Sequence, residues 1–153
     1  MSVTTCLRRT MFTLLVIWLG LWSGLAGYWF TDARLPGVIL STEAVRFDVP
    51  QGKLLAVRWV AERKHYCETT RNDYIIDSTG VRTTIPSQIF PRQPGPLGRD
   101  MFVTLTPVPS WLPLGPAVLR TQLVYVCNPV QRYITEGLVD SVETHFNVVA
   151  KDY

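Results

Sequence analysis

Five residues of reactive types stand out: Glu62, His65, Cys67 and Glu68 within one short segment, and His145 far along the chain. Imidazole, thiolate and carboxylate groups bind divalent metals or transfer protons, but a metal site needs three or four converging ligands. On a strand, His65 and Cys67 would share one face and the two glutamates the other. A metal-binding protein or enzyme using His65 and its neighbours is therefore an alternative hypothesis. We predict no catalytic, metal or cofactor residues and no cofactor.

The three cysteines divide into one that precedes an apolar segment and two that follow it. Cys67 and Cys127 lie 60 residues apart in the part of the chain after that segment. Two cysteines in an exported domain predict one disulfide, with metal ligation or a reactive thiol as alternatives. Cys6 precedes Arg8 and Arg9, so the topology described next separates it from the other two.

The apolar segment is residues 10–31, in which 22 consecutive residues carry no charge. A helix of about 20 apolar residues spans the hydrocarbon core of a bilayer. Arg8 and Arg9 precede the segment, which favours an N-terminus in the cytoplasm and a C-terminus outside. We expect a single transmembrane helix that remains as a signal anchor. The alternative is a signal peptide cleaved near Ala26.

The charge balance argues against nucleic acid as a partner. The net charge is +3, and Arg8 and Arg9 account for two of the 15 basic residues. The remaining 13 basic residues nearly balance the 12 acidic ones, so the exported part is almost neutral. Nucleic-acid binding normally needs clustered Lys and Arg on one face. The expected partners are a membrane, through the helix, and another protein.

The rest of the chain shows alternating apolar and polar residues, the pattern of half-buried strands. The pattern divides the chain into a tail (1–9), the helix (10–31), a linker (32–42) and an exported domain (43–153). Within the domain, Trp59 falls on an apolar face and Asp77 to Gly80 form a clear turn. About seven strands without a helical period predict an all-β antiparallel sandwich. The predicted strands cover residues 43–49, 53–62, 66–76, 81–85, 100–106, 117–127 and 138–150.

Residues 86–116 hold eight of the 11 prolines, so we expect loops and a sheet edge there. Ordered loops of this length often carry function. Arg92, Arg99 and Trp111 are the predicted partner-binding residues, and an exposed edge strand is an alternative surface. Prolines that only protect a sheet edge from aggregation are the other interpretation.

The domain resembles the immunoglobulin-type sandwich in three features. These are the spacing of Cys67 and Cys127, Tyr125 two residues before the second cysteine, and a final strand near the C-terminus. The resemblance implies an immunoglobulin-like fold and no particular function. Trp59 departs from the family pattern because it precedes both cysteines, so the disulfide could join other strands here.

Together these features predict a protein-interaction or structural module of the bacterial envelope. We expect it in the inner membrane, single-pass, with its C-terminal domain in the periplasm and without enzymatic activity. No Asn-X-Ser/Thr glycosylation signal occurs, which favours bacteria or their phages. A phage- or plasmid-encoded envelope or virion component is a further alternative.

Overall fold

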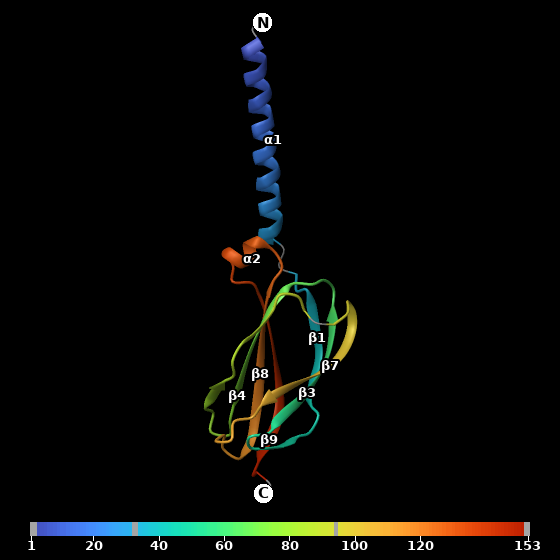
Figure 1. Ribbon diagram of the computed structural model, residues 1–153, viewed down its shortest axis with the longest axis vertical. Helices are drawn as coiled ribbons and strands as arrows, with labels where there is room; N and C mark the ends of the chain where they lie inside the picture. Colours follow the sequence, from blue (N-terminus) through green and yellow to red (C-terminus); the bar gives the residue numbers. More distant parts are fainter. Residues whose placement is uncertain (1–2, 32–33, 94, 152–153) are drawn as a thin grey trace.

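The chain forms one long helix followed by a β-sheet domain (Figure 1). This computed structural model describes residues 3–31, 34–93 and 95–151, with side chains from residue 8 onward. In these residues there are nine strands and two helices. Their bounds are α1 (Val3–Thr31), β1 (Gly37–Ala44), β2 (Asp48–Pro50), β3 (Leu54–Arg63), β4 (Glu68–Ile76), β5 (Arg82–Thr84), β6 (Gln88–Phe90), β7 (Gly98–Pro107), β8 (Gly115–Val126), α2 (Pro129–Tyr133) and β9 (Leu138–Val149).

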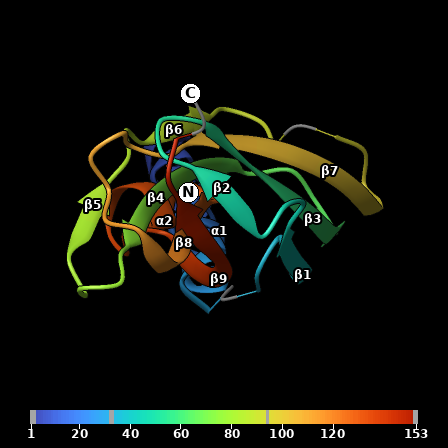
Figure 2. The same cartoon turned by 90° about the horizontal axis from the view of Figure 1, so that it is seen from below.

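Two sheets enclose the core (Figure 2). One sheet has the order β1-β3-β7; the other has the order β2-β9-β8-β4-β5, with β6 also paired to β4. Inward-facing side chains of β3, β4, β8 and β9 form most of the core, as the alternation predicted. Trp59 is part of this core and is only 3% exposed, which confirms its predicted position.

Helix α1 projects away from the sheets (Figure 1). Residues Arg8–Thr31 form a 24-residue segment that is long and apolar enough to cross a membrane, and it is not buried in the domain. Leu14, Trp18 and Leu21 are each at least half exposed. The predicted apolar helix is therefore present. The Cys6 side chain lies outside the described residues.

The predicted linker, residues 32–42, is wrong over its second half. The structure begins β1 at Gly37, and β1 pairs antiparallel with β3 from Gly37 opposite Arg63 to Ala44 opposite Val57. Pro36 and Gly37 do end the helical pattern, but the β-branched Val38 and Ile39 that follow suit a strand. The sheet domain therefore starts immediately after the helix.

The predicted sandwich of about seven antiparallel strands needs correction in number and direction. The residues predicted as one strand, 43–49, divide between the end of β1 and the short β2, and β2 pairs parallel with β9. The Asn147 amide donates to the Phe47 carbonyl at 2.7 Å. The alternation of neighbouring residues could not reveal a pairing between segments about 100 residues apart.

Two further elements lie where loops were predicted. Strand β6 falls in the proline-rich stretch, where three residues between prolines suffice to pair with β4. Helix α2 follows Asn128, whose side-chain oxygen accepts a hydrogen bond from the Gln131 amide. The predicted strand 117–127 ends just before Asn128, and Asn128-Pro129 is an N-cap followed by proline at the first helical position.

The disulfide joins neighbouring strands of one sheet. Cys67 precedes β4, Cys127 follows β8, and Glu68 and Val126 lie opposite each other in the register of these strands. The predicted Cys67–Cys127 bond is therefore present, with a Cα–Cα distance of 4.6 Å. The immunoglobulin-like detail is wrong here, because that family joins its two sheets through its cysteines.

Candidate functional site

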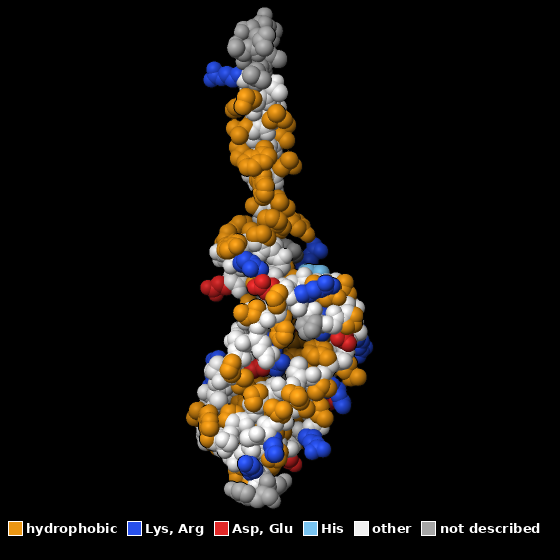
Figure 3. Space-filling view, in the orientation of Figure 1, with side chains coloured by type: hydrophobic (Ala, Val, Ile, Leu, Met, Phe, Trp, Pro, Cys, Tyr) orange, Lys and Arg blue, Asp and Glu red, His pale blue; other side chains and the backbone are white. Residues whose placement is uncertain are grey.

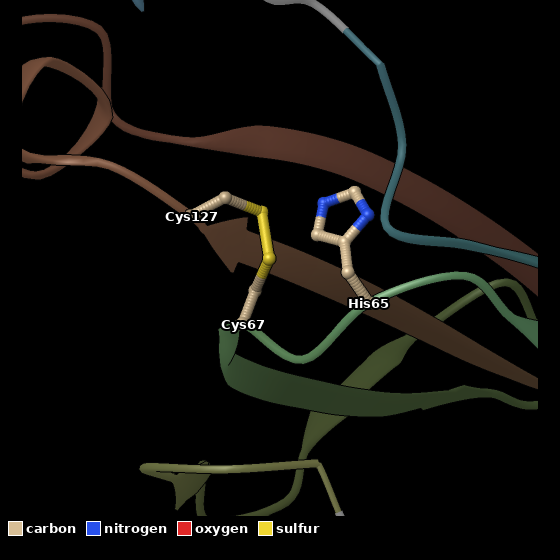
Figure 4. Close-up of side chains that lie close together, drawn as sticks. All are labelled: His65, Cys67 and Cys127. Carbon is tan, nitrogen blue, oxygen red and sulfur yellow. A yellow bond between two sulfur atoms is a disulfide. The ribbon is translucent and has the colours of Figure 1, made fainter. Parts of the chain in front are cut away.

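The structure brings only some of the predicted reactive residues together. His65 lies beside the disulfide, and one of its ring nitrogens and the two sulfur atoms lie within 4.8 Å of one another (Figure 4). Metals bind the thiolate form of cysteine, and a disulfide has no thiolate. The arrangement shown therefore offers one metal ligand, the imidazole of His65.

The other reactive residues lie elsewhere. Glu62 is exposed on β3, and Glu68 forms an ion pair with Arg132 at 2.7 Å. His145 is on β9 opposite Val118 and is exposed. The described residues therefore bring neither glutamate nor His145 to the disulfide.

The predicted partner-binding residues lie at opposite ends of β7. Arg92 stacks on the Tyr66 ring at 3.9 Å, near the start of β7, and Arg99 lies opposite Glu62. Trp111 follows the other end of β7 and is 64% exposed. A ten-residue strand is about 30 Å long, so these residues form no single patch. Trp111 and the two arginines stay as separate predicted contact points.

Strand β7 lies at the margin of its sheet and pairs on one side only, with β3. The Val108 amide donates to the Lys53 carbonyl at 2.9 Å, just beyond the end of this pair. In an antiparallel pair, alternate residues direct their backbone groups toward the partner strand. Counting back from Val108, the backbone groups of Thr104 face β3, whereas those of Val103 and Leu105 face away from it.

The free edge is open along its middle. The Met101 amide donates to Asp100 Oδ1 at 2.9 Å, which occupies one end, and Pro107 has no amide at the other. In the described part of the chain, no hydrogen bond involves the backbone groups of Val103 or Leu105 on the free side. Proline and a capping side chain at the ends of an edge limit uncontrolled pairing. The middle of the edge has no such protection.

A cavity of about 430 Å³ lies beside this edge, and we call it the β7 groove. Its lining is mainly apolar, with side chains from both sheets and from β6. The aromatic and leucine side chains are Trp59, Phe90, Phe102, Leu123 and Tyr125, and Val103 and Leu105 of β7 also border it. Free backbone groups and an apolar cavity therefore lie side by side.

The groove exists because the two sheets differ in width. On one side, Thr42 of β1 donates to the Glu143 carbonyl of β9 at 3.2 Å. On the other, Arg71 Nη2 of β4 donates to Thr106 Oγ1 of β7 at 3.2 Å. Thus β1 faces β9 and β7 faces β4. Strand β6, on the far side of β4, has no strand of the β1-β3-β7 sheet opposite it.

Two polar groups in the groove lack partners. The Gln93 Oε1 atom is buried and accepts no hydrogen bond in the described residues. Nor does the Tyr125 hydroxyl have a hydrogen-bond partner in that part of the chain, although the residue is only 2% exposed. Burial raises the pKa of Tyr125 above its ordinary value of 10.0, and the Asp140 charge adds to this. A buried polar atom normally has a partner, so Gln93 Oε1 is available to a ligand, and the Tyr125 hydroxyl lies in the same groove.

The floor of the groove is fixed by contacts within the domain. Trp59 and Phe102 stack with ring centroids 6.0 Å apart, and Trp59 Nε1 donates to Thr104 Oγ1 at 2.8 Å. At one end, Arg63 pairs with Asp100 at 2.9 Å, and the loop at Gly95 packs on this pair. A Cβ at Gly95 would lie 2.6 Å from Asp100 Oδ2, so only glycine fits.

Comparisons with known proteins assign no family to this chain. Neither protein-family models nor curated proteins match the chain. Among solved structures, an alkylpurine DNA glycosylase of Pseudomonas fluorescens, bound to DNA with an abasic site analogue, is 11% identical with a TM-score of 0.45; the match covers 76% of this chain and 31% of that one. The CARDB domain of a Pyrococcus furiosus protein with di-metal ions is 13% identical with a TM-score of 0.40; that match covers 77% of this chain and 97% of the domain. At these TM-scores neither similarity carries an argument.

Sequence reasoning did not identify the groove residues. An exposed edge strand was one of the two predicted surfaces, and the proline-rich stretch contains β7. The sequence does carry a signal for this strand, because both of its faces have apolar residues. Met101, Val103 and Leu105 lie on one face, and Phe102 lies with Thr104 on the other. A strand with one solvated face would have polar residues at one of these sets. Which edge is free depends on pairing and could not be read locally.

Proposed function

We propose that this chain is a membrane-anchored protein-interaction module of the bacterial envelope and that it has no enzymatic activity. Its β-sheet domain binds an extended segment of another protein along β7. The observation that carries this proposal is the free backbone of Val103 and Leu105 beside the β7 groove. Strand addition at an exposed sheet edge is a general mode of peptide recognition.

The geometry favours a particular kind of segment. A strand paired with β7 extends the three-stranded sheet and lies opposite β6, the strand of the other sheet that is uncovered. Its side chains then alternate between the groove and solvent. Trp59, Phe90 and Phe102 at the groove select large apolar residues at the inward positions. The Tyr125 hydroxyl and Gln93 Oε1 are available for one or two polar contacts.

A separate segment fits better than a second copy of β7. The inward-facing side chains of β7 are already engaged: Asp100 with Arg63, Phe102 with Trp59, and Thr104 with the Trp59 indole. A second β7 would therefore pair its backbone but leave the groove unfilled. An extended segment with free inward side chains satisfies both parts of the site.

The proposed location is the inner membrane, with a single span, the N-terminus in the cytoplasm and the sheet domain in the periplasm. Support comes from the span Arg8–Thr31 and from Arg8 and Arg9 at its beginning. The Cys67–Cys127 disulfide suits an oxidising compartment. Retention of the helix as an anchor is part of the proposal.

The test is peptide selection against the full chain in detergent, using a library of random linear peptides. We expect selected peptides to carry large apolar residues at alternate positions. N-methylation of alternate peptide amides, or Val103→Pro in the protein, should weaken binding by about tenfold, because backbone hydrogen bonds are lost.

Ile89→Ser is the matched control. Ile89 is 66% exposed on β6 and does not line the groove, so its loss should leave peptide affinity unchanged. Peptides that bind the Val103→Pro protein as tightly as the wild type would refute strand addition. A selection without alternating apolar residues would refute the role of the groove.

A further inference from the structure

The domain is held close to the end of α1 by a short connection. Only residues 32–36 separate the end of α1 from β1, and five residues reach at most about 17 Å. The Pro36 carbonyl accepts hydrogen bonds from the Lys64 and His65 amides at 2.7 and 3.3 Å. Pro36 is also fully buried, so the end of the connection next to β1 is fixed to the domain.

Helix α2 lies against the same end of α1 (Figure 1). The residues at its end are apolar but unusually exposed: Tyr133 is 81% and Ile134 is 62% exposed. Neither side chain contributes to the core between the sheets. In Figure 3, apolar side chains continue from α1 onto this end of the domain, with Lys and Arg side chains beside them.

Three basic residues lie at this end. Arg34 and Lys64 are exposed, and neither forms an ion pair in the described part of the chain. Arg132 is also exposed, although it pairs with Glu68. Tyrosine and basic residues are the types that favour the interface between lipid and water.

We propose that this end of the domain docks on the bilayer surface, with Tyr133 and Ile134 inserted among the lipid headgroups and Arg34 and Lys64 near lipid phosphates. The proposal rests on the proposed span of α1, because that span places the bilayer at this end of the domain. It is independent of peptide binding. An apolar tip with flanking basic residues is how peripheral segments bind a membrane surface.

The test uses the full chain in lipid nanodiscs that contain anionic phospholipid. A Cys6→Ser background leaves the disulfide intact, and single cysteines carry an environment-sensitive fluorophore. The positions are Ile134→Cys, Val81→Cys at the β4–β5 turn as a matched exposed control, and Leu19→Cys within α1. Lipids spin-labelled at the headgroup or deep in the acyl chain serve as quenchers.

We expect the headgroup quencher to reduce emission at position 134 about twofold more than at position 81. Arg34→Glu with Lys64→Glu should remove much of that difference. Equal quenching at 134 and 81, with deep quenching at Leu19, would overturn the docking while leaving the span intact. No deep quenching at Leu19 would overturn the span itself, and docking with it.

Discussion

The Arg71 guanidinium of β4 lies over the Trp59 ring of β3, 5.4 Å from the ring centroid, so that a buried cation contacts an aromatic ring across the two sheets. Asp73 supplies the counter-charge: its Oδ2 lies 2.6 Å from Arg71 Nη2, and its Oδ1 accepts a hydrogen bond from Thr121 Oγ1 at 2.6 Å. In a buried ion pair of this kind, each charge is compensated only while the other is present.

Asp73→Asn should therefore lower the free energy of unfolding by about 3–5 kcal/mol, because it leaves the Arg71 charge buried without its partner. Urea unfolding followed by tryptophan fluorescence measures the change. Glu43→Gln is the control, because the Arg58–Glu43 pair is exposed and should contribute less than about 1 kcal/mol. Equal effects of the two substitutions would contradict the role given to the buried pair.

Loss of the disulfide should destabilise the domain strongly. Cys67 and Cys127 close a loop with a sequence separation of 60 residues, for which loop-closure entropy gives about 4 kcal/mol. Cys67→Ser with Cys127→Ser should lower the free energy of unfolding by that amount in chemical denaturation. Cys6→Ser, with no part in the bond, should leave it unchanged. A double variant as stable as the wild type would show that the β4–β8 pairing alone holds this end of the sheet.

Tyr125 should make the domain sensitive to alkali. Burial raises the pKa of Tyr125 above its ordinary value of 10.0. The unfolded chain therefore releases the tyrosine proton before the folded chain does. This contribution to stability is complete below about pH 10 and is lost as the pH rises further.

Tyr125→Phe should accordingly flatten the decline of stability above about pH 10. Denaturation midpoints of both proteins across this range provide the measurement. All other residues are the same in both proteins, so the difference between the two curves isolates Tyr125. Parallel curves would contradict the inferred burial of the hydroxyl.

Because one side of β7 is unpaired, proline should have very different effects on the free energy of unfolding at two adjacent positions. The Val103 amide faces away from β3, so Val103→Pro should change the free energy of unfolding by less than about 1 kcal/mol. The Thr104 amide faces β3, so Thr104→Pro should cost about 3 kcal/mol or more. Thermal unfolding of the two variants compares them directly. The reverse order would show that the other set of amides lies free.

Much of the fold could be predicted because it depends on local patterns. The charge-free segment predicted α1, and alternation placed Trp59 in the core. The turn at Asp77 to Gly80 is present, with Asp77 Oδ1 accepting from the Thr79 and Val81 amides at 2.8 and 3.0 Å. These features need only neighbouring residues and their burial.

The remaining features depend on pairing between distant segments. The parallel pairing of β2 with β9, the position of the disulfide within one sheet and the free side of β7 all follow from strand order. His65 illustrates this, because its contact with the disulfide requires Cys127 to arrive from β8. Local sequence gave the residue types of the site but not which of them meet.

The short connection at Pro36 has a consequence for how partners are found. If α1 spans the membrane as proposed, the near end of the domain is held within about 17 Å of the bilayer, and the domain stays in a thin layer above it. A partner anchored in the same membrane would then meet β7 by lateral diffusion within that layer. Strand pairing of modest affinity would then be enough to hold such a partner.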